Sequence, residues 1–497
     1  MSDLWVRGGT IVTARETFAG DILIRDGRIA AVVHRGETLE DTRGETVQDT
    51  RSAARKDTGS EARKDTWSES RKDTGSEPLG ADAGGAAEHV RVLDATGLYV
   101  LPGLVDVHVH FRDPGLTHKE DFLSGTAAAA FGGVTTVLDM PNTVPPVASA
   151  AALADKVERV AGRAYVDYGL YGVITEDNLA ELPALAATGA IAFKLFLGPT
   201  TGDIRAPGWG KLMEVFDVVA GTGLPLVVHA EDRDVIEHWQ RRRAAEAIDY
   251  YGFLATRPRF GELMATVSVC LLAGLTGTRV HIAHVSLAEA VDLIREAKER
   301  GAPVTAETCP PYLMLTADDC QRLGPTSKIL PPIRDRLDLE RLWEGLHDGT
   351  LDVIATDHAP HLDEEKHGKS WLDAPGGMIG VETMLAALLT EVRRGRLTLQ
   401  QLVEWTSRRP AEIFGLQGRK GDIRPGCDGD LVLVDLDAQW TLRADDLHSK
   451  SRNSPFIGAT FVGKVVHTVV RGNMVVENGR LAPDPVGEWL KGQPQRP

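Results

Sequence analysis

Two histidines separated by a single residue, His108 and His110, end an apolar segment that begins at Gly97. Side chains on a strand alternate between its two faces, so both imidazoles point to the same side. A strand end of this kind can offer two nitrogen ligands to one divalent metal. Such a pair on its own is more often structural. Here, other residues of metal-binding type end later apolar segments, and together they favour a metal site.

Those other residues lie at or just after the ends of apolar segments, except Lys194, which lies within one. In chain order they are Asn142, Lys194, His229, His284 and Asp357. Side chains at the C-terminal ends of barrel strands converge on one mouth. Of the two histidines in segment 279–284 we choose His284, because it lies at the end of the segment. We interpret His281 as structural, and His118 and His358 as structural or as residues that support the ligands.

Lys194 lies within the apolar segment 190–197, where a charged ammonium is costly to bury, so we expect its pKa to be lowered. A neutral amine can react with carbon dioxide to form a carbamate, an anion that can bridge two metal ions. Taken alone, a lysine that reaches the surface would be the better interpretation; beside four histidines it is not.

Asp357 could be a metal ligand, a base or only a helix cap. Two metals would make hydroxide available at neutral pH and would polarise a carbonyl group. The chemistry that these residues predict is hydrolysis of an amide-like carbon–nitrogen bond.

Eight apolar segments carry these residues, and helical patterns separate most of them. The segments are 104–110, 133–140, 166–174, 190–197, 224–229, 279–284, 303–307 and 351–357. Ser286-Leu-Ala-Glu289 predicts a capping box at the start of one helix. Eight strands that alternate with helices predict an α/β fold, a (β/α)₈ TIM-like barrel.

Both ends of the chain have strand patterns instead. Residues 1–35 predict short strands with a hairpin turn at Asp26-Gly27, and strand patterns return over 420–480. We expect the two ends to form a small composite β-sandwich. The predicted domains are 1–35 with 89–98 (N-terminal part of the sandwich), 36–88 (insertion), 99–418 (metal-dependent barrel) and 419–497 (C-terminal part of the sandwich and tail).

The insertion 36–88 contains an octapeptide repeat. Asp-Thr recurs at 41, 49, 57, 65 and 73, and the tract is strongly polar with few aliphatic residues. It cannot bury enough apolar surface to offset the entropy of ordering. We expect a disordered surface insertion without a catalytic role, with a partner-binding tail as the alternative.

The composition is ordinary for a soluble globular protein of 497 residues, with 25% charged and 42% hydrophobic residues. The net charge of −16 and the lack of a long basic run argue against nucleic acid or an anionic membrane as a partner. The sequence shows no signal-peptide pattern and no uninterrupted apolar stretch of roughly 18 residues. The four cysteines lack a pairing pattern, which predicts reduced thiols and a cytoplasmic location.

The ordered set of ligand types resembles the amidohydrolase superfamily, in its cyclic-amidase branch. The resemblance covers the chain apart from 36–88. It implies that two Zn²⁺ ions per chain are bridged by N6-carboxylated Lys194, and that Asp357 is both a ligand and the proton shuttle. The other implied ligands are His108, His110, His229 and His284.

Within this branch the chain is most similar to dihydroorotase. Arg112 in the HxHxR motif, Asn142 in Met-Pro-Asn-Thr and His361 in Asp-His-Ala-Pro-His match the pattern that binds a substrate carboxylate. A bidentate arginine suits that task, although Arg112 could instead pair with a nearby aspartate, Asp113 or Asp121, and Asn142 could only cap a turn. Gly377, in the similar segment 374–383, is a further substrate-binding candidate.

The resemblance implies interconversion of (S)-dihydroorotate and N-carbamoyl-L-aspartate in de novo pyrimidine biosynthesis. Two positions depart from the pattern: Pro311 replaces a usual histidine, and Leu330 replaces an asparagine that contacts the pyrimidine in many dihydroorotases. Loss of such a polar contact can cost about 1–3 kcal/mol. Allantoinase and hydantoinase or dihydropyrimidinase are the alternatives.

A non-catalytic scaffold is a minor alternative. Its partner would be a protein such as aspartate transcarbamoylase. We expect a small cyclic amide with a carboxylate as the substrate, and a homo-oligomer, a dimer or a tetramer.

Overall fold

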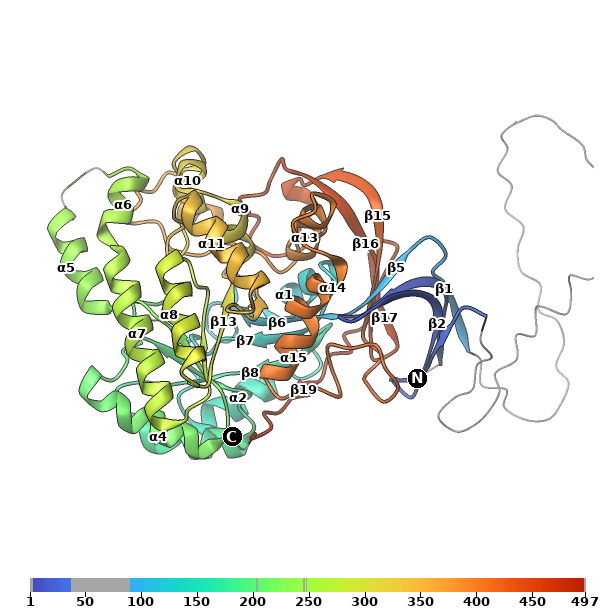
Figure 1. Cartoon of the computed structure of the whole chain (residues 1–497), viewed down its shortest axis with the longest axis horizontal. Coiled ribbons are helices and arrows are strands. Elements are labelled where there is room, and N and C mark those ends of the chain that lie inside the picture. Colours follow the sequence, from blue (N-terminus) through green and yellow to red (C-terminus); the bar gives the residue numbers. More distant parts are fainter. Residues whose placement is uncertain (1–2, 37–89, 203, 245, 247, 496–497) are drawn as a thin grey trace, which may run out of the picture.

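The computed structural model describes residues 3–36, 90–202, 204–244, 246 and 248–495. The predicted insertion at 36–88 lies outside these residues apart from Gly36. Figure 1 shows two parts, a barrel surrounded by helices and a sheet that combines strands from both ends of the chain. The fold therefore confirms the predicted barrel with a composite β domain.

The barrel strands are parallel and follow the eight predicted segments. They are β6 (Leu104–Val109), β7 (Val134–Asp139), β8 (Asp167–Leu170) with β9 (Gly172–Val173), β10 (Phe193–Phe196), β11 (Leu226–His229), β12 (Val280–Ile282), β13 (Val304–Thr308) and β14 (Val353–Ile354). Each pairs with the next, and β8 and β9 are separated only by Tyr171. A parallel bridge between Val109 and His358 closes the ring.

Helices surround the ring and cover its outer face. They are α1 (Phe122–Phe131), α2 (Ala150–Val160), α3 (Leu182–Thr188), α4 (Leu212–Thr222), α5 (Arg233–Arg243), α6 (Tyr250–Thr256), α7 (Arg259–Thr276), α8 (Ala288–Glu299), α9 (Pro310–Met314), α10 (Ala317–Leu323), α11 (Arg336–His347), α12 (Asp363–Lys366), α13 (Met384–Arg393), α14 (Leu399–Val403) and α15 (Arg409–Ile413). The stretch Tyr250–Thr276 is apolar enough on average to match a membrane span. In the fold it is two helices, α6 and α7, separated at Arg257-Pro258.

The predicted capping box at Ser286 is wrong. Helix α8 begins at Ala288, and Leu287 at its N-cap makes no side-chain capping bond. The Ser286 hydroxyl instead donates to Glu262 Oε2 at 2.7 Å, and its backbone N–H donates to Oε1 at 3.1 Å. Ser286 is therefore hydrogen-bonded to a buried carboxylate of α7 and does not cap α8.

The second part is one nine-stranded sheet. Its order is β18-β17-β16-β15-β5-β1-β2-β3, with β4 paired to β1. The strands are β1 (Leu4–Val12), β2 (Thr17–Arg25), β3 (Arg28–His34), β4 (Arg91–Asp94), β5 (Tyr99–Pro102), β15 (Leu431–Thr441), β16 (Thr460–Val470), β17 (Asn473–Glu477) and β18 (Arg480–Leu481). The predicted hairpin turn at Asp26-Gly27 is confirmed, because Arg25 pairs with Arg28.

Buried charges join this sheet to the barrel. Lys420 Nζ donates to Asp167 Oδ2 of β8 at 2.5 Å and to Asp430 Oδ2 at 2.6 Å. Arg471 also binds Asp167, which is fully buried. Near the C-terminus, β19 (Trp489–Leu490) pairs in parallel with β8. The last segment of the chain therefore returns to the barrel.

Candidate metal centre

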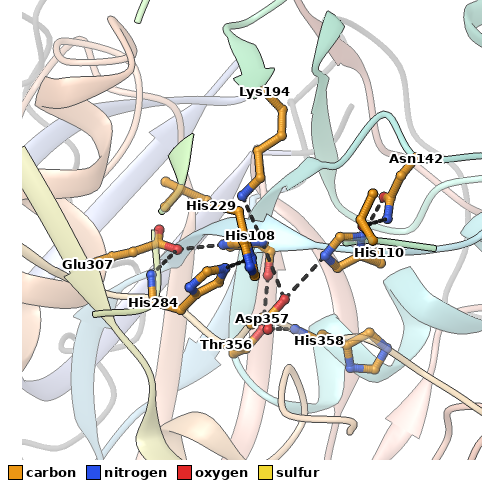
Figure 2. Close-up of polar contacts among 12 residues, drawn as sticks. His108, His110, Asn142, Lys194, His229, His284, Glu307, Thr356, Asp357 and His358 are labelled. Carbon is orange, nitrogen blue, oxygen red and sulfur yellow. Dashed lines mark hydrogen bonds and ion pairs between the residues drawn. The ribbon is translucent and has the colours of Figure 1, made fainter. Parts of the chain in front are cut away.

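The six predicted ligands come together at one end of the barrel. His108 lies in β6 and His110 just after it, Lys194 in β10, and His229 at the end of β11. His284 and Asp357 lie two and three residues after β12 and β14. Figure 2 shows the six side chains pointing toward one another. The rule that barrel sites form at the C-terminal strand ends explains this convergence.

The first cluster is formed by His108, His110 and Asp357. Asp357 Oδ1 lies 3.3 Å from His108 Nε2 and 3.2 Å from His110 Nε2. The ligand atoms of all three residues lie within 4.8 Å of one another. Two imidazole nitrogens and a carboxylate oxygen are donors that suit a divalent ion such as zinc, so these residues fit a metal.

The second cluster is formed by His229 and His284. His229 Nδ1 lies 3.1 Å from His284 Nε2, and both side chains are buried. His284 Nδ1 has no hydrogen-bond partner in the described part of the chain. Burial lowers the pKa of both imidazoles, so they are neutral and can act as ligands. Two neutral nitrogens at this separation fit a shared cation.

Lys194 lies beside both clusters. Its Nζ is 3.4 Å from His108 Nε2, and its charge contributes to the lowered pKa values of His229 and His284 after the larger effect of burial. Among the described residues, this buried amine forms no ion pair with a carboxylate, although Glu307 and Asp357 lie near enough to raise its pKa against the larger effect of burial. Burial lowers the pKa of Lys194 to about 8. An amine at this position, without a carboxylate as ion-pair partner, could be carboxylated to a carbamate that would bind both ions.

Three acceptors that the sequence analysis did not assign to this role orient the histidines. His108 Nδ1 donates to Glu307 Oε1 at 2.5 Å, and His281 Nε2 donates to Glu307 Oε2 at 3.1 Å. His110 Nδ1 donates to Asn142 Oδ1 at 2.7 Å. An acceptor on the outer nitrogen fixes the ring and leaves the inner nitrogen free for a metal.

The third acceptor is Glu231, which receives a hydrogen bond from His229 Nε2 at 2.9 Å. Of the three, only Asn142 was predicted as a site residue. The available signals were the positions of these residues: Asn142 lies three residues after β7, Glu231 two residues after β11, and Glu307 one residue before the end of β13.

The backbone at this mouth is strained. Arg112, His284 and Asp357 have φ values of 61°, 38° and 48°, in the left-handed region that non-glycine residues rarely occupy. The Thr356 N–H donates to Asp106 Oδ1 at 3.1 Å and its hydroxyl donates to Oδ2 at 2.5 Å, which holds the end of β14 against β6. Strain of this kind persists only where the surroundings enforce it, and it is concentrated at functional sites.

The charge of Asp357 is set by its neighbours. Burial raises the pKa of this carboxyl group, but the histidines His108, His110 and His284 outweigh that effect and hold the pKa below its ordinary value. Asp357 is thus an ionised carboxylate at neutral pH. It can bind a cation or accept a proton.

A cavity of about 330 Å³ opens over the two clusters. Arg112 lies in its wall and is 2% exposed. Its Nε donates to the Pro360 carbonyl at 3.4 Å, and Nη1 has no partner among the described residues. Arg112 does not pair with Asp113 or Asp121, which bind Arg163 and Lys450. Arg112 therefore lines the cavity and keeps one buried guanidinium nitrogen without a partner among the described residues.

The other predicted substrate residues occupy different positions. His361 does not line the cavity; it lies behind Arg112, with Nε2 3.4 Å from Arg112 Nη2 and Nδ1 3.2 Å from Lys119 Nζ. Gly377 lines the cavity, but its N–H donates to the Lys328 carbonyl at 2.9 Å. Its φ of 142° and an added Cβ only 2.5 Å from the Ala359 oxygen explain why glycine is required there.

The two departures from the expected pattern also differ in position. Leu330 lines the cavity, whereas Pro311 lies in the first turn of α9, away from the cavity wall. The cavity thus combines a candidate cation cluster with an ionised carboxylate, a pair of buried histidines, an arginine and an apolar leucine. Such a site can carry out metal-assisted hydrolysis of a small substrate that has an anionic or polar group.

Comparisons with known proteins agree with this chemistry. The sequence profile of the amidohydrolase family matches residues 99–475. The chain is 40% identical to an allantoinase of Rubrobacter xylanophilus, over 83% of this chain and 91% of that protein. It is also 40% identical to a dihydroorotase of Trichlorobacter lovleyi, over 78% of this chain and 89% of that protein.

A solved structure is similar over almost the whole chain. It is an L-hydantoinase (dihydropyrimidinase) of Arthrobacter aurescens, with a TM-score of 0.85 and 32% sequence identity. The match covers 99% of this chain and 100% of the other. The similar proteins thus carry three different activity names.

Proposed function

The chain belongs to the amidohydrolase family, and from this premise we propose that it is a zinc-dependent cyclic amidohydrolase that acts as a dihydroorotase. The substrate would be (S)-dihydroorotate, opened reversibly to N-carbamoyl-L-aspartate. The proposal unites the two cation clusters, the adjacent carboxylate and the arginine in the cavity wall.

The ligand sets assign the residues that would hold two ions. His108, His110 and Asp357 would bind one ion, and His229 and His284 would bind the other. The carbamate of Lys194 would bind both ions. Two bound zinc ions supply hydroxide at neutral pH and polarise the scissile carbonyl.

The side chains of the protein perform the remaining steps. Asp357 is ionised and close to both His108 and His110, so it can accept the proton released during attack and return it to the departing ring nitrogen. Arg112 would hold the substrate carboxylate and so orient the ring amide toward the clusters.

The observation that carries the substrate assignment is the unpaired Nη1 of Arg112. A buried guanidinium with a free donor favours an anionic ligand, because an unmet charged donor is costly to bury. Dihydroorotate carries a carboxylate outside its reacting amide, whereas allantoin and hydantoin do not.

Allantoin is the second candidate, because Leu330 lines the cavity. A leucine offers no hydrogen bond to a pyrimidine ring. The identity to an allantoinase equals that to a dihydroorotase, at 40%.

Steady-state assays with dihydroorotate, allantoin and hydantoin test the assignment. We expect the highest kcat/KM with dihydroorotate; turnover of allantoin without turnover of dihydroorotate would contradict it. Arg112→Met should raise KM for dihydroorotate by about 10- to 100-fold, which corresponds to about 1.5–3 kcal/mol for a charged hydrogen bond. Arg163→Met, which removes the arginine bound to Asp113, is the matched control and should leave KM unchanged.

The zinc content tests the scaffold alternative. A catalytic chain should bind two zinc ions, whereas a scaffold need not. The homo-oligomer, the cytoplasmic location and a link to aspartate transcarbamoylase stay predictions.

A further inference from the structure

One ligand histidine faces the metal centre with the opposite ring nitrogen from the other three. His108, His110 and His284 turn Nε2 toward the centre, whereas His229 turns Nδ1. A neutral imidazole carries its proton on one nitrogen and uses the other as a ligand, so a partner on the outer nitrogen decides which one is free. A specific contact must therefore hold the His229 ring in its reversed orientation.

Glu231 makes that contact. Its Oε2 accepts a hydrogen bond from His229 Nε2 at 2.9 Å, and the Arg257 guanidinium donates to the same oxygen. Glu231 and Arg257 are only 2% and 3% exposed. Because Arg257 compensates the carboxylate and fixes its position, Glu231 can accept the proton of His229 without becoming a metal ligand itself.

We propose that Glu231, held by Arg257, is a positioning residue that leaves His229 Nδ1 free to bind the second metal. The inference rests on the metal centre proposed above. The first cluster uses other acceptors, Glu307 and Asn142. Loss of the Glu231 carboxylate should therefore weaken the second metal site and spare the first.

Arg257 also connects Glu231 to the wall of the cavity. It lies between α6 and α7 and also lines the cavity wall. Its backbone carbonyl accepts a hydrogen bond from Arg334 Nη2 at 2.9 Å, which anchors the segment. The pair thus connects a wall of the cavity directly to a ligand of the second cluster.

Metal binding by Glu231→Gln tests the proposal. This variant keeps the size of the side chain, but it replaces the carboxylate oxygen that accepts from both Arg257 and His229 Nε2 by a neutral amide oxygen, which is a weaker acceptor and no longer compensates the charge of Arg257. Zn²⁺ per chain is measured after dialysis against graded metal buffers, and Co²⁺ absorption reports the geometry of each site. We expect two ions in the wild-type protein, and in the variant one tight ion with a second bound 10- to 100-fold more weakly.

Arg257→Met should weaken the same site, and Arg257→Lys should weaken it less, because an ammonium still supports the carboxylate. Glu262→Gln is the matched control: Glu262 is 4% exposed and accepts from Ser286, but it contacts no ligand histidine. This control should retain two ions.

An unchanged affinity for the second ion in folded Glu231→Gln would overturn the proposal. Equal weakening of both ions, or the same loss in Glu262→Gln, would show a merely structural role and would also overturn it. A wild-type chain that binds fewer than two ions would refute the metal centre itself, which is a distinguishable result.

Discussion

The Lys194 amine lies in an apolar strand without an acidic partner in the described part of the chain, and burial lowers its pKa to about 8. A neutral amine is the form that reacts with carbon dioxide. The resulting carbamate would replace a costly buried cation by an anion beside two metal ions. At this scale, the chemistry of a single side chain explains why a lysine is placed among histidines.

Labelling with ¹³C-bicarbonate in the presence of Zn²⁺ should give a carbamate carbon signal by NMR. Lys194→Met should lose this signal and bind zinc at least about 10- to 100-fold more weakly. Lys156→Met removes a buried lysine that pairs with Asp139, and it should retain the signal. A Lys194→Met chain that still carries two tight zinc ions would contradict the bridging role.

Residue types in the apolar segments predicted that these six side chains meet at one mouth of the barrel, and the family resemblance implied that they are metal ligands. Residue types could not assign the orienting acceptors, since Glu307 reaches His108 across 199 positions in the chain. The same limit applies to Asn142, whose Oδ1 is occupied by His110, and to His361, which lies behind Arg112. Such details depend on distances between strands, which sequence spacing does not contain.

At the scale of elements, the link between β6 and β14 determines where Asp357 lies. Thr356 binds Asp106 through both its N–H and its hydroxyl, and the adjacent Asp357 has a φ of 48°. The strained turn is therefore held by the residue before it.

Thr356→Val keeps the shape of the side chain but removes the hydroxyl from buried Asp106. We expect a loss of about 1–3 kcal/mol of stability, from the unmet carboxylate oxygen, and a fall in kcat, because Asp357 loses its support. Thermal unfolding and steady-state kinetics measure the two effects. Thr350→Val, at a threonine without this contact, is the control; equal kcat values for the two variants would show that the tether does not position Asp357.

The strands and helices themselves were largely predictable, since apolar segments and their spacing give the barrel. The start of α8 was not, because Ser286 binds Glu262 of α7 instead of capping its own helix. A local pattern cannot anticipate a stronger acceptor from a distant element.

At the scale of the whole molecule, stability should depend on buried lysines as well as on the apolar core. Lys366 is fully buried, and it donates to the carbonyl oxygens of Lys328, at 3.1 Å, and Gly377. Burial lowers the pKa of both Lys366 and Lys328 to about 7.

Between pH 7 and about 10.5, the unfolded chain therefore binds more protons than the folded chain at these lysines, so their contribution to the free energy of unfolding rises with pH. Below pH 7 the full penalty of the buried charge is present. Lys366→Met should flatten the rise measured by denaturant unfolding between pH 7 and 9.5. An unchanged slope relative to the wild-type protein would show that Lys366 titrates normally.

For the β domain, the sequence predicted only that strands from both ends of the chain associate, and not how the domain is attached to the barrel. Its attachment to the barrel includes Lys420, which joins Asp167 of the barrel to Asp430 at the start of the C-terminal strands. A lysine and three aspartates spread over more than 250 positions show no local pattern. Their meeting follows only from the completed fold.

The pairing of β19 with β8 has a consequence for how the protein is made. Trp489 and Leu490 complete a strand pair whose other member, Tyr168 and Gly169, leaves the ribosome more than 300 residues earlier. That strand edge therefore lacks this partner until the later segment has been synthesised. Dependence on chaperones during synthesis should accordingly matter more for this protein than its regular architecture suggests.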